Sequence, residues 1–233
     1  MTSVVIVQAR MGSTRLPGKV LMSLGGRTVL DHVLVRCKAV AADAVCLATS
    51  TLARDDAVAR EATRLGVHVF RGDEHDVLSR YHGAARELGA SEVLRVTADC
   101  PLIDPEVCAQ VIARRRNAGT DYACNFSPPS FPHGLDCEAF TMETLERAQR
   151  ESKAAYQREH VSVWMIESPD ITKANLANPG ADASRHRWTL DTPDDFRFLS
   201  GVFETCAAAL SSMRWRDLLA CLDTAAPGAE PRR

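Results

Sequence analysis

Residues 3–19 read SVVIVQARMGSTRLPGK, and this stretch decides the fold class. Its first part, Ser3 to Gln8, is rich in β-branched residues, which predicts a short β-strand. The loop that follows contains Gly12 and Gly18, where the backbone can turn sharply and come close to a ligand. Apolar residues at positions 29, 30, 33, 34 and 37 then have the spacing of one helix face, which predicts a helix over 28–40. The chain therefore begins as a strand, a loop and a helix.

The same alternation continues to residue 118. Further strands are predicted at 44–48, 67–70 and 92–96, and further helices at 55–65, 76–88 and 105–118. Strands that alternate with helices in this way predict an α/β fold, with a mostly parallel sheet sandwiched by helices. Ligands of such sheets bind at the carboxyl ends of the strands. We therefore expect the site in the loops that follow Gln8, Ala48, Phe70 and Val96.

The pattern changes after Asp121. Three prolines predict a loop over 125–133. Strands are predicted beyond it at 137–140, 171–174 and 188–190, and helices at 141–151, 154–167, 193–210 and 213–222. We expect a single domain over residues 1–223 with a loop-rich insertion at about 125–190, followed by a frayed tail at 224–233.

Composition excludes several classes of protein. The 233 residues include 28 Lys and Arg against 30 Asp and Glu, a formal net charge of −2, whereas dedicated nucleic-acid-binding proteins usually carry a basic excess. No apolar run is long enough to span a membrane, and the N-terminus lacks the features of a signal peptide. The eight cysteines form no CxxC pair and no zinc-ligand spacing. We therefore expect a cytoplasmic protein with reduced thiols and with neither nucleic-acid nor membrane partners.

The loop over residues 8–19 has the composition of a phosphate-binding site. Arg10, Arg15 and Lys19 surround it with positive charge, and backbone N–H groups near Gly12 can donate to phosphate oxygens. The spacing differs from a P-loop, because five residues separate Gly12 from Gly18 and a valine follows Lys19. A dinucleotide-binding GxGxxG is also absent from the sequence. The residues favour a polyphosphate ligand over an ordinary surface turn.

Two aspartates are candidate metal ligands. Asp99 emerges at the end of the predicted strand 92–96, and Asp104 already serves as the N-cap of the helix that begins at Pro105. Mg²⁺ usually takes one or two carboxylates together with phosphate oxygens, which suits Asp99 beside a phosphate loop. Asp191 is either a second ligand or the N-cap of the helix that begins at Pro193, and Thr192 could cap that helix equally well.

Seven ordered blocks, spread over a span of about 190 residues, carry a resemblance to a known family. They are QARMGSTRLPGKVL at 8–21, ATS at 48–50, FRGDEHDVLSRY at 70–81, RVTADCPLIDP at 95–105, HGLDCEAF at 133–140, REHVSVWM at 158–165 and RWTLDTPDDF at 187–196. The chain resembles the cytidylyltransferases that make CMP-activated acidic sugars, such as the CMP-Kdo and CMP-sialic acid synthetases. Within that family it is most similar to the branch of spore coat polysaccharide biosynthesis protein F.

The resemblance implies a GT-A-like (Rossmann-like) nucleotidyltransferase fold and a homodimer that uses CTP and Mg²⁺. Lys19, Arg10 and Asp99 would be catalytic, and Asp99 and Asp191 would hold Mg²⁺. The nucleotide would be bound by Ala9, Gly12, Ser13, Arg15, Thr49, Ser50, Arg71 and Thr97; some relatives have Gln at the position of Thr97. The insertion would shape the acceptor pocket, with candidate contacts from His133, Asp136, Glu138, Arg158, His160 and Arg187.

The implied reaction transfers CMP from CTP to a hydroxyl, or another nucleophilic oxygen, of an acidic sugar or a similar acid, and releases pyrophosphate. One alternative is a transferase of the sugar-1-phosphate or molybdopterin type that uses another nucleotide, although its loop usually begins with an LAGG-like turn. A GT-A glycosyltransferase normally needs a DxD motif, which Asp99-Cys100-Pro101 does not supply. A third alternative is a nucleotide-binding protein without turnover, against which the presence of Lys19, Asp99 and Asp191 argues.

Overall fold

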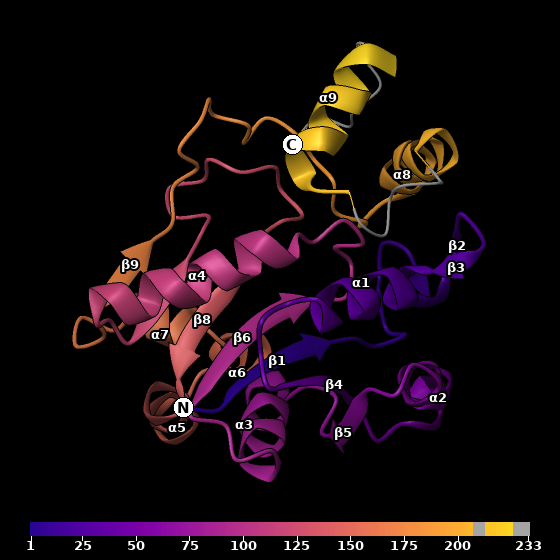
Figure 1. The fold of residues 1–233 in the computed structure, drawn as a ribbon. Coiled ribbons are helices and arrows are strands. Elements are labelled where there is room, and N and C mark those ends of the chain that lie inside the picture. The colour runs from indigo at the N-terminus through magenta and orange to yellow at the C-terminus, as the bar shows by residue number, and fades with distance from the viewer. Residues whose placement is uncertain (207–212, 226–233) are drawn as a thin grey trace.

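A seven-stranded sheet with the order β5-β4-β1-β6-β8-β7-β9 forms the centre of this computed structural model, which describes residues 1–206 and 213–225 (Figure 1). Its strands are β1 (Ser3–Gln8), β4 (Ala44–Ser50), β5 (His68–Gly72), β6 (Glu92–Thr97), β7 (Tyr122–Cys124), β8 (Glu138–Thr141) and β9 (Lys173–Asn175). Strands β5, β4, β1 and β6 run parallel, β8 is antiparallel to both of its neighbours, and β7 pairs in parallel with β9. The predicted mostly parallel sheet is confirmed.

Helices cover both faces of this sheet. They are α1 (Val29–Lys38), α2 (Asp56–Arg64), α3 (Val77–Glu87), α4 (Pro105–Ala118), α5 (Met142–Glu151), α6 (Ala155–Glu159), α7 (Val163–Glu167), α8 (Pro193–Thr205) and α9 (Trp215–Ala225). Figure 1 shows α1 and α4 on one face and α3 and α5 on the other. Among the residues that the structure describes, no helix is long and apolar enough to cross a membrane.

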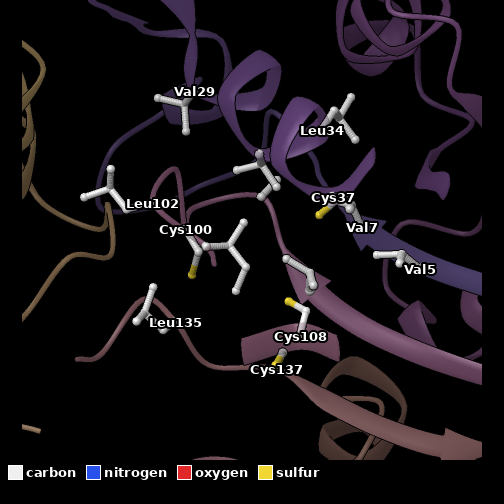
Figure 2. Packing of buried hydrophobic residues seen from close by; sticks show 14 of the residues in the cluster. Val5, Val7, Val29, Leu34, Cys37, Cys100, Leu102, Cys108, Leu135 and Cys137 are labelled. Carbon is white, nitrogen blue, oxygen red and sulfur yellow. The ribbon is translucent and has the colours of Figure 1, made fainter. Parts of the chain in front are cut away.

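Alternate side chains of the central strands pack into two separate cores. Val5 and Val7 of β1 contact the core beneath α1, α2 and α4, which α8 and α9 extend (Figure 2). Val4 and Ile6 of the same strand pack on the opposite face against α3, α5 and α7. All four side chains are fully buried, because a central parallel strand has helices on both sides. The continuous apolar run in the sequence is the signature of this position.

Local capping signals set several helix ends as the sequence predicts. The Thr28 hydroxyl accepts a hydrogen bond from the Asp31 amide at the start of α1. The Asp104 carboxylate accepts from the amides of Glu106 and Val107 at the start of α4, and Gly119 ends that helix with a left-handed φ of 64°. These short-range interactions depend on three or four neighbouring residues, which is why they can be predicted from sequence.

The predicted strand at 188–190 is wrong. This segment is extended and buried, but its backbone bonds go to different partners: the Trp188 amide donates to the His133 carbonyl, and the Leu190 amide donates to the Asp99 carbonyl. The bridge nearest to this segment is an isolated one between His133 and Arg187. The apolar pattern of this segment reflects its burial, and a buried strand has the same pattern. Among the described residues, the segment is not part of a continuous β-ladder.

The predicted single helix at 154–167 is also wrong. It is divided into α6 and α7 by a turn in which Val161 adopts a positive φ of 49°. A β-branched residue with this φ is strained, so the surrounding structure must hold it. The turn places His160 in the cavity described below.

Smaller differences lie at the ends of elements. Strand β7 and the hairpin of β2 (Ser23–Leu24) and β3 (Arg27–Thr28) were not predicted, because two or three residues carry no readable period. Strand β9 begins two residues later than expected. Of the predicted helix 193–210, residues 207–210 lie outside the described residues. Helix α9 extends to Ala225, and the remainder of the predicted tail, 226–233, also lies outside them.

Gly134→Ala is expected to lower the free energy of unfolding by about 2 kcal/mol or more. Gly134 has a φ of 109°, and a Cβ there would lie 2.7 Å from the Trp188 carbonyl carbon and 2.8 Å from the Thr189 nitrogen. These contacts are with backbone, so no side chain can move aside. Urea unfolding measures the loss. Gly201→Ala is the control, because a Cβ at this helical position meets open space; an equal loss in both variants would contradict the prediction.

Candidate active site

A cavity of about 410 Å³ opens at the carboxyl ends of β1 and β6. Predicted site residues in its wall are Ala9, Arg10, Gly12, Ser13, Arg15, Lys19, Thr97, Asp99, His160 and Asp191. The wall also contains Gln8, Thr14, Val20, Val77, Arg80, Ala98 and Glu159, which the sequence did not single out. The loop over residues 8–19, called the glycine loop below, thus lies at the carboxyl ends of the strands, where parallel sheets bind their ligands.

The glycine loop is held in shape from both sides. The Asp55 carboxylate accepts a hydrogen bond of 2.7 Å from the Met11 amide. The Met11 carbonyl accepts from the amides of Ser13 and Gly18, and Gly18 has the left-handed φ of 71° that precedes the short 3₁₀ helix at Lys19–Leu21. The loop therefore folds back so that Lys19 reaches the strand ends.

Lys19 lies at the centre of the site, between the two predicted metal ligands. Its Nζ donates to Asp99 Oδ2 at 2.7 Å, to Asp191 Oδ1 at 2.8 Å and to the Leu190 carbonyl at 2.8 Å. Burial alone would lower the pKa of Lys19, but the two carboxylates outweigh it and raise that pKa above its ordinary value. Burial would likewise raise the pKa of Asp99, yet the Lys19 ammonium holds it below the ordinary value. Both groups are therefore charged near neutral pH.

The oxygens around Lys19 suit a hard divalent cation. Two carboxylate oxygens and one carbonyl oxygen converge on a single point, and Mg²⁺ prefers oxygen ligands. Among the described residues, no group of three or more His, Cys, Asp or Glu side chains is arranged to hold a metal ion. A cation here would therefore complete its shell with phosphate or water oxygens, as Mg²⁺ commonly does.

The segment that carries Asp191 is fixed by an ion-pair network. Arg187 donates to Asp195 at 2.9 Å and contacts Asp191 Oδ2 at 3.2 Å. The Asp195 carboxylate also accepts from the amides of Asp191 and Thr192, both at 2.8 Å. The Thr192 hydroxyl caps α8 through the Asp195 amide, so the capping role falls to Thr192 and leaves Asp191 to face the cavity. Arg187, a predicted acceptor contact, lies outside the cavity wall and contacts Asp191 and Asp195.

The cavity wall also contains a buried arginine that the sequence did not indicate. Arg80 of α3 is 1% exposed and donates to the backbone carbonyls of Asp73 and Glu74. Its Nε has no hydrogen-bond partner among the described residues. Burial lowers the pKa of Arg80. The one sequence signal that could have indicated Arg80 is its place in the block at 70–81. In the helical pattern alone, Arg80 occupies an ordinary polar position.

An ion pair beside the cavity connects the glycine loop to the end of α6. Arg10 pairs with Glu159 at 3.2 Å, and both side chains line the cavity beside His160. Arg158, the neighbour of Glu159, turns away from the cavity, and its Nε donates to Asp76 at 2.7 Å. Of the acceptor candidates, the structure brings His160 to the cavity.

Several other predicted residues lie away from this cavity. Thr49 and Ser50 are fully buried, and Ser50 bonds to Asp55, the residue that holds the glycine loop. Arg71 donates to the carbonyls of Ser50 and Leu52 and pairs with Asp56. The remaining residues outside the cavity wall are His133 and Asp136, which pair with each other, and Glu138, which is 2% exposed and pairs with Arg95.

Comparisons with known proteins place this geometry in a family. A family model described as cytidylyltransferase matches residues 4–208. The spore coat polysaccharide biosynthesis protein SpsF of Bacillus subtilis is 32% identical over 206 residues, which cover 85% of this chain and 85% of that protein. An uncharacterized protein of Methanocaldococcus jannaschii is 36% identical over 195 residues, which cover 82% of this chain and 79% of that protein.

A solved structure agrees with these relatives. The structure of a cytidylyltransferase from Leptospira borgpetersenii superposes with a TM-score of 0.89 at 31% identity, over 96% of this chain and 94% of that chain. The resemblance predicted from the seven sequence blocks is confirmed.

Proposed function

The chain belongs to the cytidylyltransferase family, and on this premise we propose that it transfers CMP from CTP to a nucleophilic oxygen of a small acidic sugar or a similar acid, with Mg²⁺ as cofactor and pyrophosphate as the leaving group. The observation that carries the proposal is the convergence of Lys19, Asp99 and Asp191 beside the glycine loop in one cavity. A role in polysaccharide synthesis is supported by the likeness to the spore coat protein.

The cavity offers the charge that a nucleoside triphosphate needs. Arg10, Arg15 and Lys19 line it together with the backbone of Gly12. The Ser13 amide already donates to the Met11 carbonyl, so Ser13 would reach a phosphate through its hydroxyl. Arg80 would add a buried positive charge to the cavity wall. Arginine and lysine donors of this kind bind phosphate oxygens with charge-assisted hydrogen bonds.

The mechanism is mainly positioning and electrostatic stabilisation. The acceptor oxygen attacks the α-phosphorus in line with the departing pyrophosphate, and negative charge grows on the phosphoryl oxygens. Lys19 and Arg10 would neutralise that charge from the side of the loop. Asp99 and Asp191 would hold Mg²⁺, which when bound supplies further positive charge and lowers the pKa of the attacking hydroxyl.

The acceptor would lie against His160, near the ion pair of Arg10 and Glu159. His133 and Asp136 remain acceptor candidates in the insertion. Arg158 and Glu138 would affect acceptor binding only through the residues that they contact. The homodimer, the cytoplasmic location and the single domain over 1–223 stay predictions.

CTP is expected to raise the melting temperature more than UTP, GTP or ATP, and Mg²⁺ is expected to enlarge the shift. At a ligand concentration of 100 times Kd, binding stabilises the folded state by about 2.7 kcal/mol, which shifts a chain of this size by roughly 5–11 °C. Thermal unfolding with each nucleotide, with and without Mg²⁺, measures the effect. Cytidine, which lacks phosphates, is the control.

Each outcome of this measurement has a defined meaning. A preference for another nucleotide would favour a transferase of the sugar-1-phosphate type. No shift with any nucleotide, in the presence of candidate acids as well as in their absence, would refute the phosphate-binding role of the loop. A selective shift with CTP would support the proposal, and release of pyrophosphate from CTP with a panel of acidic sugars would then identify the acceptor.

A further inference from the structure

The Lys19 ammonium occupies the position at which the proposed metal ligands converge. The Lys19 ammonium lies 2.7–2.8 Å from oxygens of Asp99, Asp191 and Leu190. Its side chain is only 12% exposed, so it is enclosed by these groups rather than free in solvent. We propose that Lys19 is a tethered cation that blocks the metal position until the nucleotide phosphates bind it, so that the divalent ion binds together with the nucleotide and hardly without it. This inference rests on the proposed function of the site.

Lys19 and a divalent ion compete for the same oxygen atoms. An ammonium at hydrogen-bond distance from both carboxylates leaves no room for an ion coordinated to those two oxygens. Two cations held a few ångströms apart would also repel each other strongly in a partly buried site.

Further cations weaken Asp191 as a metal ligand. Arg15 contacts Asp191 Oδ1 at 3.2 Å, and Arg187 contacts Oδ2 at 3.2 Å. Both oxygens of this carboxylate therefore face positive charge from the chain. A divalent ion alone would have to displace Lys19 without offering it another anion.

A nucleotide removes this obstacle because it brings its own negative charge. Lys19 lies in the cavity wall next to the residues of the glycine loop, and its flexible stem lets the ammonium move from the carboxylates to phosphate oxygens. Asp99 and Asp191 are then released for the metal. Linkage requires the two ligands to help each other by the same factor, typically about 5- to 150-fold.

Binding of Mn²⁺ without nucleotide tests the inference, because loss of the free-ion paramagnetic resonance signal reports occupancy independently of turnover. Wild-type protein is expected to bind Mn²⁺ with a Kd of about 1 mM or weaker, the range of weak oxygen-ligand sites. Lys19→Met removes the competing charge and is expected to bind Mn²⁺ about tenfold tighter or more. Lys19→Arg keeps a tethered cation and is expected to bind as weakly as wild type.

The double variant Lys19→Met with Asp99→Asn shows whether the ion binds at Asp99. It thereby distinguishes failure of the blocking role of Lys19 from failure of the proposed metal site. Tight binding by Lys19→Met that disappears in the double variant supports the inference. If wild type itself binds Mn²⁺ at micromolar concentration through Asp99, or if Lys19→Arg binds as tightly as Lys19→Met, the blocking role of Lys19 is overturned and the metal site stands. If no variant binds Mn²⁺ through Asp99, the proposed metal site itself is wrong. If circular dichroism shows that Lys19→Met fails to fold, micromolar binding by wild type still overturns the inference, and Lys19→Gln replaces Lys19→Met as the uncharged variant.

Discussion

Asp99→Asn is expected to lower the rate of pyrophosphate release by about 10²–10³-fold while leaving the fold intact. Asp99 lies two residues after the end of β6, in the cavity wall, where its Oδ2 accepts from Lys19 at 2.7 Å. Asparagine has nearly the same shape but carries no charge. It would therefore weaken both the ion pair with Lys19 and the proposed coordination of the metal. Steady-state release of pyrophosphate from CTP, with an acceptor identified by the screen, measures the loss.

Asp194→Asn is the matched control for this prediction. It makes the same chemical change three residues from Asp191, but Asp194 is exposed in the first turn of α8 and pairs with Arg197 on the surface. Its turnover is expected to stay at the wild-type value, and both variants should melt near the wild-type temperature. Unchanged turnover in Asp99→Asn would contradict the assignment of Asp99 as a metal ligand.

Glu138→Ala is expected to lower the free energy of unfolding by about 3–5 kcal/mol, as the loss of one partner of a buried ion pair commonly does. The carboxylate is 2% exposed and accepts hydrogen bonds from Arg95 at 2.9 Å, from the Tyr122 hydroxyl at 3.0 Å and from the Ser162 hydroxyl at 2.9 Å. Removal of the carboxylate would leave a largely buried guanidinium and two hydroxyls without this partner. Urea unfolding followed by circular dichroism measures the change.

Two further variants sharpen the interpretation. Glu138→Gln keeps oxygen and hydrogen-bonding capacity at the site but loses the charge, so a smaller loss than with alanine is expected. Glu204→Ala alters an exposed position near the end of α8 and is expected to change stability by no more than about 0.5 kcal/mol. A loss in Glu138→Ala no larger than that of Glu204→Ala would show that the buried network contributes little.

The network around Glu138 is a role that the sequence did not indicate. Glu138 stands in the block at 133–140, which the resemblance assigns to the acceptor pocket, and in the predicted strand 137–140. In the structure it belongs to β8 and joins that strand to β6 and β7. Its bond to Ser162 reaches the turn that contains the strained Val161 and the cavity residue His160. A carboxylate in a loop and one inside a sheet look alike in sequence, because burial depends on residues far along the chain.

The features that depend on near neighbours in the chain could be predicted from the sequence. The continuous apolar run in β1 predicted a central strand, and Asp104 with Gly119 bounded α4 correctly. The glycines and cations of residues 8–19 predicted the loop at the edge of the sheet, and the seven blocks identified the family. These signals are readable because the conformation of a strand, a cap or a glycine turn is set within a few residues.

The assembly of the site depends on contacts between residues that are far apart in the sequence. Lys19 meets Asp99 across 80 residues and Asp191 across 172 residues, distances over which no sequence period extends. The order of the strands and the buried segment at 188–190 bring these groups to one point, and the same packing puts Arg80 in the wall and Glu138 in the interior. Residue types can indicate which chemistry is available, but the free energy of packing the whole chain determines which side chains meet.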